Sequence, residues 1–258
     1  MAKLLIFRGI YDESRCIIAP HTYLVEHADS DYTTQHGTIA KEELQKPDGS
    51  TIHSNTGKSF ILLSASFHDI HNRLKKLPQT IPHKDLGSVA VHASIKKDST
   101  VLDCGLGSGA LALFLASICK QVIAYEKNPA TIAVAGENIL RCDMHNITVK
   151  EKDIIQGIDE TELDAITLDI PEPWKVVGHA ATALKSGGYL VAYTPTVNQI
   201  ATFNDVVATH PHMTHEHTLE LIERAWKASH NIQRPVNTPI GHSGFLSFAR
   251  CIREKKTP

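Results

Sequence analysis

The feature that most constrains this chain is an alternation of short apolar segments with helical segments, which begins near residue 66. The apolar segments are near-continuous runs such as VIAY and YLVAY, which are typical of a parallel sheet covered on both faces. We therefore predict a doubly wound α/β domain. The expected strands are Thr100–Cys104, Gln121–Tyr125, Thr148–Lys152, Ala165–Leu168, Tyr189–Tyr193, Thr214–Leu219 and Phe245–Ala249. The expected helices are Ala110–Ser117, Ala130–Arg141, Trp174–Leu184 and Gln199–Ala208, with Pro129 where one begins and Gly187-Gly188 where one ends.

Residues 1–65 follow a different pattern. Apart from Lys41–Leu44 they show no helical period, and turn residues such as His36-Gly37 and Pro47-Asp48-Gly49 separate short apolar or β-branched runs. This pattern predicts a small antiparallel β module over residues 1–65, followed by a Rossmann-like domain over residues 66–258. The expected strands of the module are Leu4–Phe7, Cys16–Ala19, Tyr23–Val25, Thr38–Ala40 and Phe60–Leu63.

The composition is that of a globular protein. Hydrophobic residues make up 42% and charged residues 21% of the chain, which excludes general disorder. No apolar run approaches the ~20 residues of a membrane span, and the first 15 residues lack the pattern of a secretory signal. The five cysteines are odd in number and never spaced C-x-x-C, so no disulfide framework or cysteine zinc site is expected. A cytoplasmic location fits these features best.

The first strand of the α/β domain runs directly into a glycine-rich loop. The segment Thr100–Gly109 reads TVLDCGLGSG, a G-x-G-x-G pattern at the start of an apolar helix. Glycines let the loop turn tightly and let a ligand approach the backbone. The spacing differs from the dinucleotide fingerprint G-x-G-x-x-G, and Asp103 would repel a pyrophosphate. A cationic cofactor without phosphate fits better, and S-adenosylmethionine is such a cofactor.

Acidic residues follow the second and third strands. Glu126 lies 21 residues beyond Gly105, where a carboxylate can accept the hydroxyls of a ribose. Asp153 could accept a hydrogen bond from an adenine amino group while Ile154 covers the ring. Taken alone, Asp153 is more typical of a helix cap.

The fourth strand ends in the string LDIPEPW, Leu168–Trp174. An acid that leaves the carboxyl end of a parallel strand points into the ligand crevice, so Asp169 is a candidate catalytic residue. Pro171 and Pro173 restrict the backbone that follows, and Trp174 offers a flat face for a base. A proline-rigidified Asx-turn is the structural alternative.

At this point the sequence resembles a known family. Leu102–Gly109, Leu168–Trp174, Val191–Pro195 (VAYTP) and Gly241–Leu246 (GHSGFL) together are similar to the tRNA (adenine-58-N1) methyltransferases of the homo-oligomeric archaeal and bacterial type. The resemblance implies a β-barrel-like module followed by a class I S-adenosylmethionine-dependent methyltransferase domain. It also implies a homotetramer that methylates N1 of an adenine in the T-loop of tRNA. Some archaeal relatives also methylate the neighbouring adenine-57.

The resemblance implies roles for individual residues. Asp169 would be catalytic, and Tyr193 would lie near the target base. The family has an aromatic residue or His followed by Pro before its Lys-Asp pair, whereas this chain has Pro82-His83, so His83 is a candidate for the contact to adenosine. The implied cofactor-binding residues are Gln79, Gly105, Leu106, Gly107, Ser108, Gly109, Glu126, Lys127, Asp153, Ile154 and Asp169.

The charge distribution suggests where tRNA could bind. Residues 71–100 hold six Lys or Arg against two Asp or Glu, a net charge of +4, directly before the glycine-rich loop. A solvated face is one interpretation. The other is a phosphate-binding patch, in which Arg73, Lys75 and Lys76 contact tRNA.

Sixteen histidines raise the question of a metal site. Four of them lie within His210–His217, but two fall on each face of a strand, so one strand could not direct all four at one ion. Packed or solvated histidines are therefore expected there, and no metal is predicted. His242 lies within the late Gly-His motif and could either pack against the proline-rich loop or contact substrate.

The expected mechanism follows from adenine chemistry. The enzyme would align adenine N1 with an already electrophilic methyl group, and Asp169 would hydrogen-bond the exocyclic amine and stabilise the developing positive charge. The target base must be exposed and inserted into the pocket. The alternatives are a class I methyltransferase for another RNA, a small molecule or a protein carboxylate, a nicotinamide-dependent oxidoreductase, and a catalytically silent RNA-binding subunit. The last would lack the loop glycines or Asp169.

Overall fold

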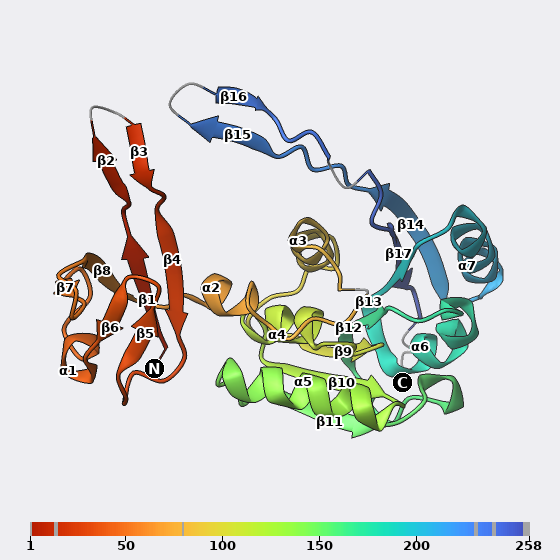
Figure 1. Cartoon of the computed structure of the whole chain (residues 1–258). Coiled ribbons are helices and arrows are strands. Elements are labelled where there is room, and N and C mark those ends of the chain that lie inside the picture. Colours follow the sequence, from red (N-terminus) through yellow and green to blue (C-terminus); the bar gives the residue numbers. More distant parts are fainter. Residues whose placement is uncertain (1, 13–14, 79, 230–231, 239–240, 255–258) are drawn as a thin grey trace. The chain divides into compact units, whose positions relative to one another are not determined.

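The structure is a computed structural model, which describes residues 2–12, 15–78, 80–229, 232–238 and 241–254 (Figure 1). The chain forms two compact units, Met1–Leu74 and Lys75–Pro258. The division therefore falls later than the boundary at residue 65 that the sequence pattern suggested. Helix α2 (Phe67–His71) belongs to the first unit, and a capping box at Ser66 and Asp69 begins it.

The first unit is built on a four-stranded antiparallel sheet in the order β4-β1-β8-β7. These strands are β1 (Lys3–Phe7), β4 (His21–Val25), β7 (Thr51–His53) and β8 (Ser59–Ser64). Two further strand pairs are β2 (Ile10–Asp12) with β3 (Arg15–Ile18) and β5 (Tyr32–Thr34) with β6 (Gly37–Ile39), and α1 spans Lys41–Leu44. The alternating pattern of the strands directs one set of side chains into a common core with Leu44 of α1. The strand residues of this core are Leu5, Phe7, Val25, Ile39, Ile52, Phe60 and Leu62.

The second unit contains a seven-stranded sheet in the order β11-β10-β9-β12-β13-β17-β14. The first five strands are parallel, and β17 runs antiparallel to both β13 and β14. The strands are β9 (Thr100–Cys104), β10 (Gln121–Glu126), β11 (Ile147–Glu151), β12 (Leu163–Leu168), β13 (Leu184–Thr194), β14 (Met213–Glu220) and β17 (Phe245–Cys251). A hairpin of β15 (Trp226–Ser229) and β16 (Ile232–Pro235) extends beyond β14 in Figure 1.

Helices cover both faces of this sheet, as the near-continuous apolar strands predicted. The helices of one face are α3 (His83–His92), α4 (Ala110–Ala116) and α5 (Pro129–Arg141). The other face carries α6 (Val177–Ala183) and α7 (Val197–Thr209), with the 3₁₀ turns η1 (Ile154–Gln156) and η2 (Pro173–Val176). Val101 of β9 packs on the face of the sheet that carries α3, α4 and α5. Its neighbour Leu102 packs on the opposite face, which carries α6 and α7.

One helix boundary differs from the sequence expectation. The segment Trp174–Leu184 divides into η2 and α6, and the helix ends at Ala183. Gly187 and Gly188, expected at a helix end, lie within β13 instead. A Cβ at Gly188 would lie 3.0 Å from the carbonyl oxygens of Leu163 and Asp164, so this glycine permits close approach of neighbouring strands.

The strand order indicates where a ligand would bind at the edge formed by the carboxyl ends of the strands. In a doubly wound sheet ligands bind outside the carboxyl ends of the strands, where the chain connections diverge to opposite sides. Here that point lies between β9 and β12, which are paired neighbours with Cys104 beside Leu168. Within the described part of the chain, no helix is both long and apolar enough to cross a bilayer.

Candidate active site

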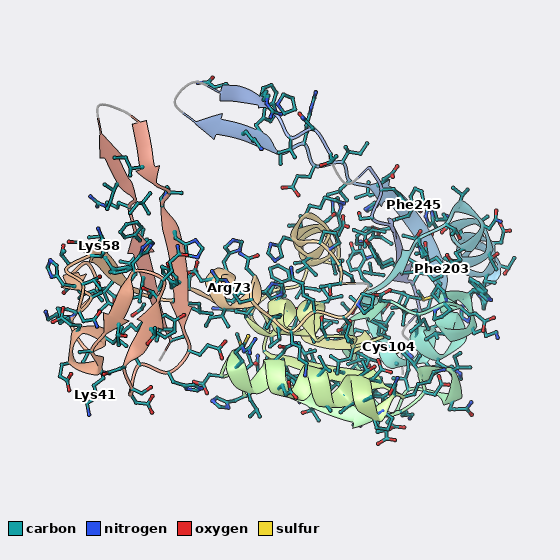
Figure 2. All side chains as sticks on the ribbon, viewed as in Figure 1. Lys41, Lys58, Arg73, Cys104, Phe203 and Phe245 are labelled. Carbon is teal, nitrogen blue, oxygen red and sulfur yellow. The ribbon has the colours of Figure 1, made fainter. Side chains whose placement is uncertain are left out.

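A backbone contact between two loops forms the centre of the site. Cys104, labelled in Figure 2, ends β9, and Gly105 follows with φ of 85°. A Cβ at Gly105 would lie 2.0 Å from the carbonyl oxygen of Asp169, so only glycine allows this approach. The amide of Asp169 also donates to the carbonyl oxygen of Cys104 at 2.8 Å. The glycine-rich loop therefore fixes the backbone of the candidate catalytic acid.

Two cavities open at this edge of the sheet. The first has a volume of about 240 Å³, and the second, beside the glycine-rich loop, about 20 Å³. Gly105 and Asp169 line both cavities. The other lining residues of the first are Cys104, Tyr125, Glu126, Lys127, Lys152, Asp153, Ile154, Ile155, Ile170, Pro171 and Glu172. Those of the second are Thr80, Ile81, Asp103, Leu106, Gly107, Ser108, Ala110 and Leu111.

The cavities bring together nearly all the cofactor-binding residues expected from the sequence. Gly109 does not line either cavity, but with φ of 80° it is the N-cap of α4. Gln79 lies outside the described residues. Thr80 and Ile81, which no sequence motif indicated, line the second cavity. Their roles toward a ligand stay predictions.

Glu126 is held at the end of β10 by the turn that follows it. Its Oε1 accepts the amides of Lys127 at 2.8 Å and Asn128 at 2.9 Å. Both bonds use Oε1, so the oxygen left for a ribose is Oε2 rather than both oxygens.

Asp153 has the capping role that the sequence left open, and its contact to an adenine stays a prediction. It caps η1, since its Oδ1 accepts the amide of Ile155 at 3.1 Å, and it also lines the first cavity. Its Oδ2 lies 3.4 Å from the Nζ of Lys127. The cap fixes the direction in which this carboxylate faces the cavity.

Two carboxyl groups, those of Asp103 and Asp169, share the second cavity. Asp103 is fully buried and accepts a hydrogen bond from Thr167 Oγ1 at 2.6 Å. Burial and the neighbouring charge of Asp169 raise the pKa of Asp103 to about 7, and burial raises the pKa of Asp169 to about 6. No Lys or Arg occurs among the described residues that line this cavity. A cationic ligand such as S-adenosylmethionine fits this donor set, because it would compensate the buried negative charge.

Sequence reasoning missed a buried asparagine that supports the glycine-rich loop. Asn138 of α5 is 1% exposed, and its Nδ2 donates to the carbonyl oxygens of Ser108 at 2.8 Å and Lys75 at 3.0 Å. Its Oδ1 accepts the amide of Lys75 at 2.9 Å. One side chain thus fixes both the loop and the start of the second unit, and no local pattern signals this, because the partners are 30 and 63 residues away.

The residues expected to contact substrate lie outside the two cavities. Tyr193 is half-buried, and its Oη donates to Asp85 at 3.2 Å. His83 is exposed at the start of α3, and Trp174 is half-buried in η2. Their contacts to a target base stay predictions.

The basic segment is less free than its charge suggests. Lys75 pairs with Glu137 at 3.0 Å, and the Nη2 of Arg73 donates to the carbonyl oxygen of Thr22 at 3.1 Å. Lys76 is exposed and has no ion pair among the described residues. Of the three residues named from the sequence, Lys76 is therefore the most available to a phosphate.

The clustered histidines pack against their surroundings. His217 of β14 stacks on Phe248 with a centroid distance of 4.8 Å, and its Nε2 lies 3.1 Å from Nδ1 of His92. His215 Nε2 lies 3.0 Å from Thr218 Oγ1. In the described residues, no group of three or more His, Cys, Asp or Glu side chains could hold a metal ion.

His242 connects the late Gly-His motif to two neighbouring segments. Its Nδ1 lies 2.6 Å from Oε1 of Glu220, and its Nε2 lies 2.9 Å from the carbonyl oxygen of Pro195. The two contacts to acceptor oxygens favour the doubly protonated imidazolium, so the hydrogen bonds to Glu220 and Pro195 raise the pKa of His242. Pro195 follows β13 and is not part of the loop with Pro171 and Pro173, so both alternatives for His242 stay predictions.

Comparison with known proteins decides the family. Residues 71–233, more than half of the chain, match the model of the family described as tRNA methyltransferase complex GCD14 subunit. This chain belongs to that family. The resemblance found in the sequence motifs is thereby confirmed.

Relatives of this GCD14-family chain span almost its whole length. It is 30% identical over 258 residues to the tRNA (adenine(57)-N(1)/adenine(58)-N(1))-methyltransferase TrmI of Methanocaldococcus jannaschii, covering 88% of this chain and 90% of the relative. It is 27% identical over 220 residues to the tRNA (adenine(58)-N(1))-methyltransferase TrmI of Thermus thermophilus, covering 83% and 86%.

Solved structures share the fold. A SAM-dependent O-methyltransferase from Thermotoga maritima gives a TM-score of 0.80 at 27% identity, covering 99% of this chain and 94% of that one. The tRNA (m1A58) methyltransferase TrmI from Aquifex aeolicus gives 0.76 at 20% identity, covering 98% of both chains. The predicted class I methyltransferase fold is confirmed.

The position of Glu126 predicts a loss of cofactor affinity on substitution. A charge-assisted bond to a ribose hydroxyl contributes roughly 1.5–3 kcal/mol, so Glu126→Ala is expected to raise the Kd for S-adenosylmethionine about 10- to 100-fold. Glu126→Gln keeps an acceptor for the amides of Lys127 and Asn128 and serves as the matched variant, with a smaller loss. Calorimetry gives the Kd, and circular dichroism checks folding. Wild-type affinity in both variants would contradict this placement.

The raised pKa of Asp103 predicts the pH dependence of stability. Its neutral form is favoured in the folded state, so this stabilisation is complete below the unfolded pKa near 4 and is lost as pH rises through about 7. Asp103→Asn should remove this dependence, which is on the order of 2–4 kcal/mol between pH 4 and 7.

Urea unfolding at a series of pH values measures the effect. Asp98→Asn is the control, since the pKa of exposed Asp98 is lowered by its hydrogen bond with Lys96. Equal pH slopes for wild type and Asp103→Asn would show that Asp103 ionises normally.

Proposed function

We propose that this chain transfers a methyl group from S-adenosylmethionine to N1 of adenine-58 in the T-loop of tRNA. The observation that carries the proposal is that Asp169 lines both cavities at the carboxyl edge of the sheet. The methyl-bearing sulfur of the cofactor joins its nucleoside to its amino-acid part. Asp169 lines both the larger cavity, which would hold the nucleoside, and the cavity beside the glycine-rich loop, which would hold the amino-acid part. The methyl-bearing sulfur between these two parts would therefore lie near Asp169.

The residues of the two cavities would hold the two ends of the cofactor. Glu126 and Asp153 would bind the ribose and the adenine, and the loop Gly105–Gly109 would bind the amino-acid end near Asp103. When bound, the cofactor supplies an electrophilic methyl group on a sulfonium. The protein would then mainly exclude water and align the target nitrogen.

Asp169 would act on the target base. Methylation at N1 places positive charge on the adenine, which makes the exocyclic amine a stronger donor. A partly buried carboxylate can accept from that amine and stabilise the charge, and it does so more strongly where water is excluded. No covalent intermediate with the protein is required.

The names of the relatives support tRNA as the substrate, and one of them also points to the main alternative, methylation of a hydroxyl group. The Methanocaldococcus jannaschii and Thermus thermophilus relatives are named for tRNA adenine N1, whereas the Thermotoga maritima structure is named as an O-methyltransferase. A hydroxyl acceptor needs a general base, and the pKa of about 6 for Asp169 would suit one. The LDIPEPW segment and family membership favour tRNA.

The direct test maps the product. Unmodified tRNA is incubated with the enzyme and methyl-labelled cofactor, and modified nucleosides are located by mass spectrometry. We expect 1-methyladenosine at position 58, and position 57 is scored because one relative is named for both. Label in a small molecule, in a protein or at another RNA position would overturn the proposal.

A homotetrameric assembly and a cytoplasmic location belong to the same proposal. The family resemblance supports the assembly, and the cysteine usage and the relatives named as tRNA methyltransferases support the location. Analytical ultracentrifugation of the full chain tests the assembly, and a monomer at micromolar concentration would contradict it.

Asp169 is expected to affect the rate far more than cofactor affinity. Removal of one pre-aligned group that stabilises transition-state charge commonly costs on the order of 10²–10³ in rate. Asp169→Ala should lose this factor in single-turnover methylation at saturating tRNA and cofactor, and Asp169→Asn should fall between it and wild type. Near-normal turnover by the alanine variant would contradict the assignment.

The same variants predict a pH profile. The carboxylate must be ionised to accept from the amine with full strength, so the rate should rise with pH through the pKa of Asp169, which is about 6 in the protein alone. A bound cationic cofactor favours the ionised form, so the kinetic midpoint should lie at or below 6. Asp169→Asn should give a flat profile over this range.

Lys76 is expected to contact a tRNA phosphate. Lys76→Glu should weaken tRNA binding and reduce the salt slope by about one unit per lost contact. Lys120→Glu is the matched control, because exposed Lys120 directly precedes β10 and so lies at the amino end of that strand, away from the carboxyl ends where the cavities open. An unchanged slope in Lys76→Glu would show that this lysine is only solvated.

A further inference from the structure

A buried carboxylate outside the two cavities collects three donors from three segments. Asp85 of α3 is 0% exposed, and its Oδ1 lies 2.7 Å from Nζ of Lys84. Its Oδ2 accepts from Ser243 Oγ at 2.8 Å and from Tyr193 Oη at 3.2 Å. Lys84 also donates to Ser243 Oγ at 2.6 Å. The cluster thus joins α3, the end of β13 and the segment before β17.

Tyr193 is the member of this cluster that lies on the strand next to the one leading to Asp169. Leu168 and Ala192 are register partners on the parallel strands β12 and β13, so Asp169 and Tyr193 follow as neighbours on the same face of the sheet. The negative charge of Asp169 also contributes to the raised pKa of Tyr193. Asp169 and Tyr193 are therefore neighbours at the carboxyl ends of β12 and β13.

The late Gly-His motif makes room for the tyrosine ring. A Cβ at Gly244 would lie 2.5 Å from Cζ and 2.8 Å from Oη of Tyr193. Ser243 binds the same carboxylate as the phenol, and His242 binds the carbonyl oxygen of Pro195 just after β13. The segment Gly241–Gly244 therefore fixes the position of Tyr193.

The direction of the Tyr193–Asp85 hydrogen bond follows from the partners. A carboxylate accepts hydrogen bonds, and on this side chain Oδ1 already lies 2.7 Å from the Nζ of Lys84, so Oδ2 is the acceptor left for the phenol. The single phenolic proton of Tyr193 is therefore committed to Asp85. Any further hydrogen-bond partner of Tyr193 Oη must therefore donate to it.

We propose that Asp85 is a positioning residue that holds Tyr193 as a hydrogen-bond acceptor beside Asp169, so that the two oxygens receive the two N–H groups of the exocyclic amine of adenine. This inference rests on the proposed function. Guanine has a carbonyl oxygen at position 6. This oxygen is an acceptor and could not donate a hydrogen bond to either Asp169 or Tyr193. The pair thereby selects adenine over guanine, because unpaired buried polar groups are costly.

A double-mutant cycle separates positioning from a structural role. Asp85→Asn replaces the carboxylate that binds the phenolic proton of Tyr193 with an amide, which is either a donor or a weaker acceptor. Because Tyr193 would then no longer be held as an acceptor, the single-turnover rate at saturating tRNA and cofactor should fall at least about 10-fold. In a Tyr193→Phe background the same change should have little further effect, because the hydroxyl on which it acts is gone. Asp98→Asn, at an exposed site, is the control and should keep the wild-type rate.

Equal losses in both backgrounds would show that Asp85 acts through the fold and would overturn the proposal. Retained wild-type rate in Asp85→Asn would overturn it as well. The Kd for the cofactor should stay unchanged in all four variants, which separates this effect from a damaged glycine-rich loop.

A spectroscopic readout keeps this inference distinguishable from the proposed function. The chain has six tyrosines, and the ¹³Cζ resonance missing in Tyr193→Phe identifies Tyr193 in labelled protein. That resonance should shift in Asp85→Asn. It should also shift in Ser243→Ala, which removes one donor to Asp85 but keeps the Lys84–Asp85 pair. This second variant replaces the first in the test if Asp85→Asn does not fold. If the Tyr193 resonance moves in neither variant, the hydrogen bond between Tyr193 and Asp85 is overturned, whatever the substrate is. If the resonance moves but the enzyme does not methylate tRNA, only the proposed function and the recognition of adenine by Tyr193 and Asp169 are overturned.

Discussion

The close approach of Gly105 to the backbone of Asp169 is the constraint on which the rest of the site depends. With the carbonyl oxygen of Asp169 only 2.0 Å from where a Cβ would be, any side chain at position 105 would push β9 and β12 apart at their carboxyl ends. The amide of Asp169 bonds to Cys104 across the same gap. This contact places the acid where the two cavities meet, and every functional role proposed for it follows from that position.

Electrostatics adds a second constraint. Asp103 and Asp169 are both held with raised pKa values, and the described lining of their cavity supplies no cation. Such an arrangement costs stability at neutral pH in the protein alone. A ligand that carries a sulfonium and an ammonium group offsets this cost, so the same feature favours a cationic cofactor and disfavours a dinucleotide with its pyrophosphate.

The sequence predicted the fold well because the decisive signals were local. Near-continuous apolar strands indicated burial on both faces, and Val101 and Leu102 indeed pack on opposite sides of the sheet. The turn signal of Gly187-Gly188 was also local, but it was wrong as a helix end, because the need for close strand approach at Leu163 placed Gly188 inside β13.

The supporting residues of the site could not be predicted in this way. Asn138 binds Ser108 across 30 residues, and Asp85 binds Ser243 across 158, so neither has a pattern in its own neighbourhood. Charge along the chain also gave an incomplete view of the basic segment, since Lys75 is paired with Glu137 of a distant helix. Only the folded arrangement shows which polar groups already have partners.

A crystal structure of the full chain with S-adenosylhomocysteine tests the central claim most directly. The account predicts the nucleoside in the cavity with Glu126 and Asp153, the amino acid beside Gly107, and the sulfur within about 4 Å of Asp169. A product bound with its sulfur remote from Asp169, or with its nucleoside outside the first cavity, would contradict the account.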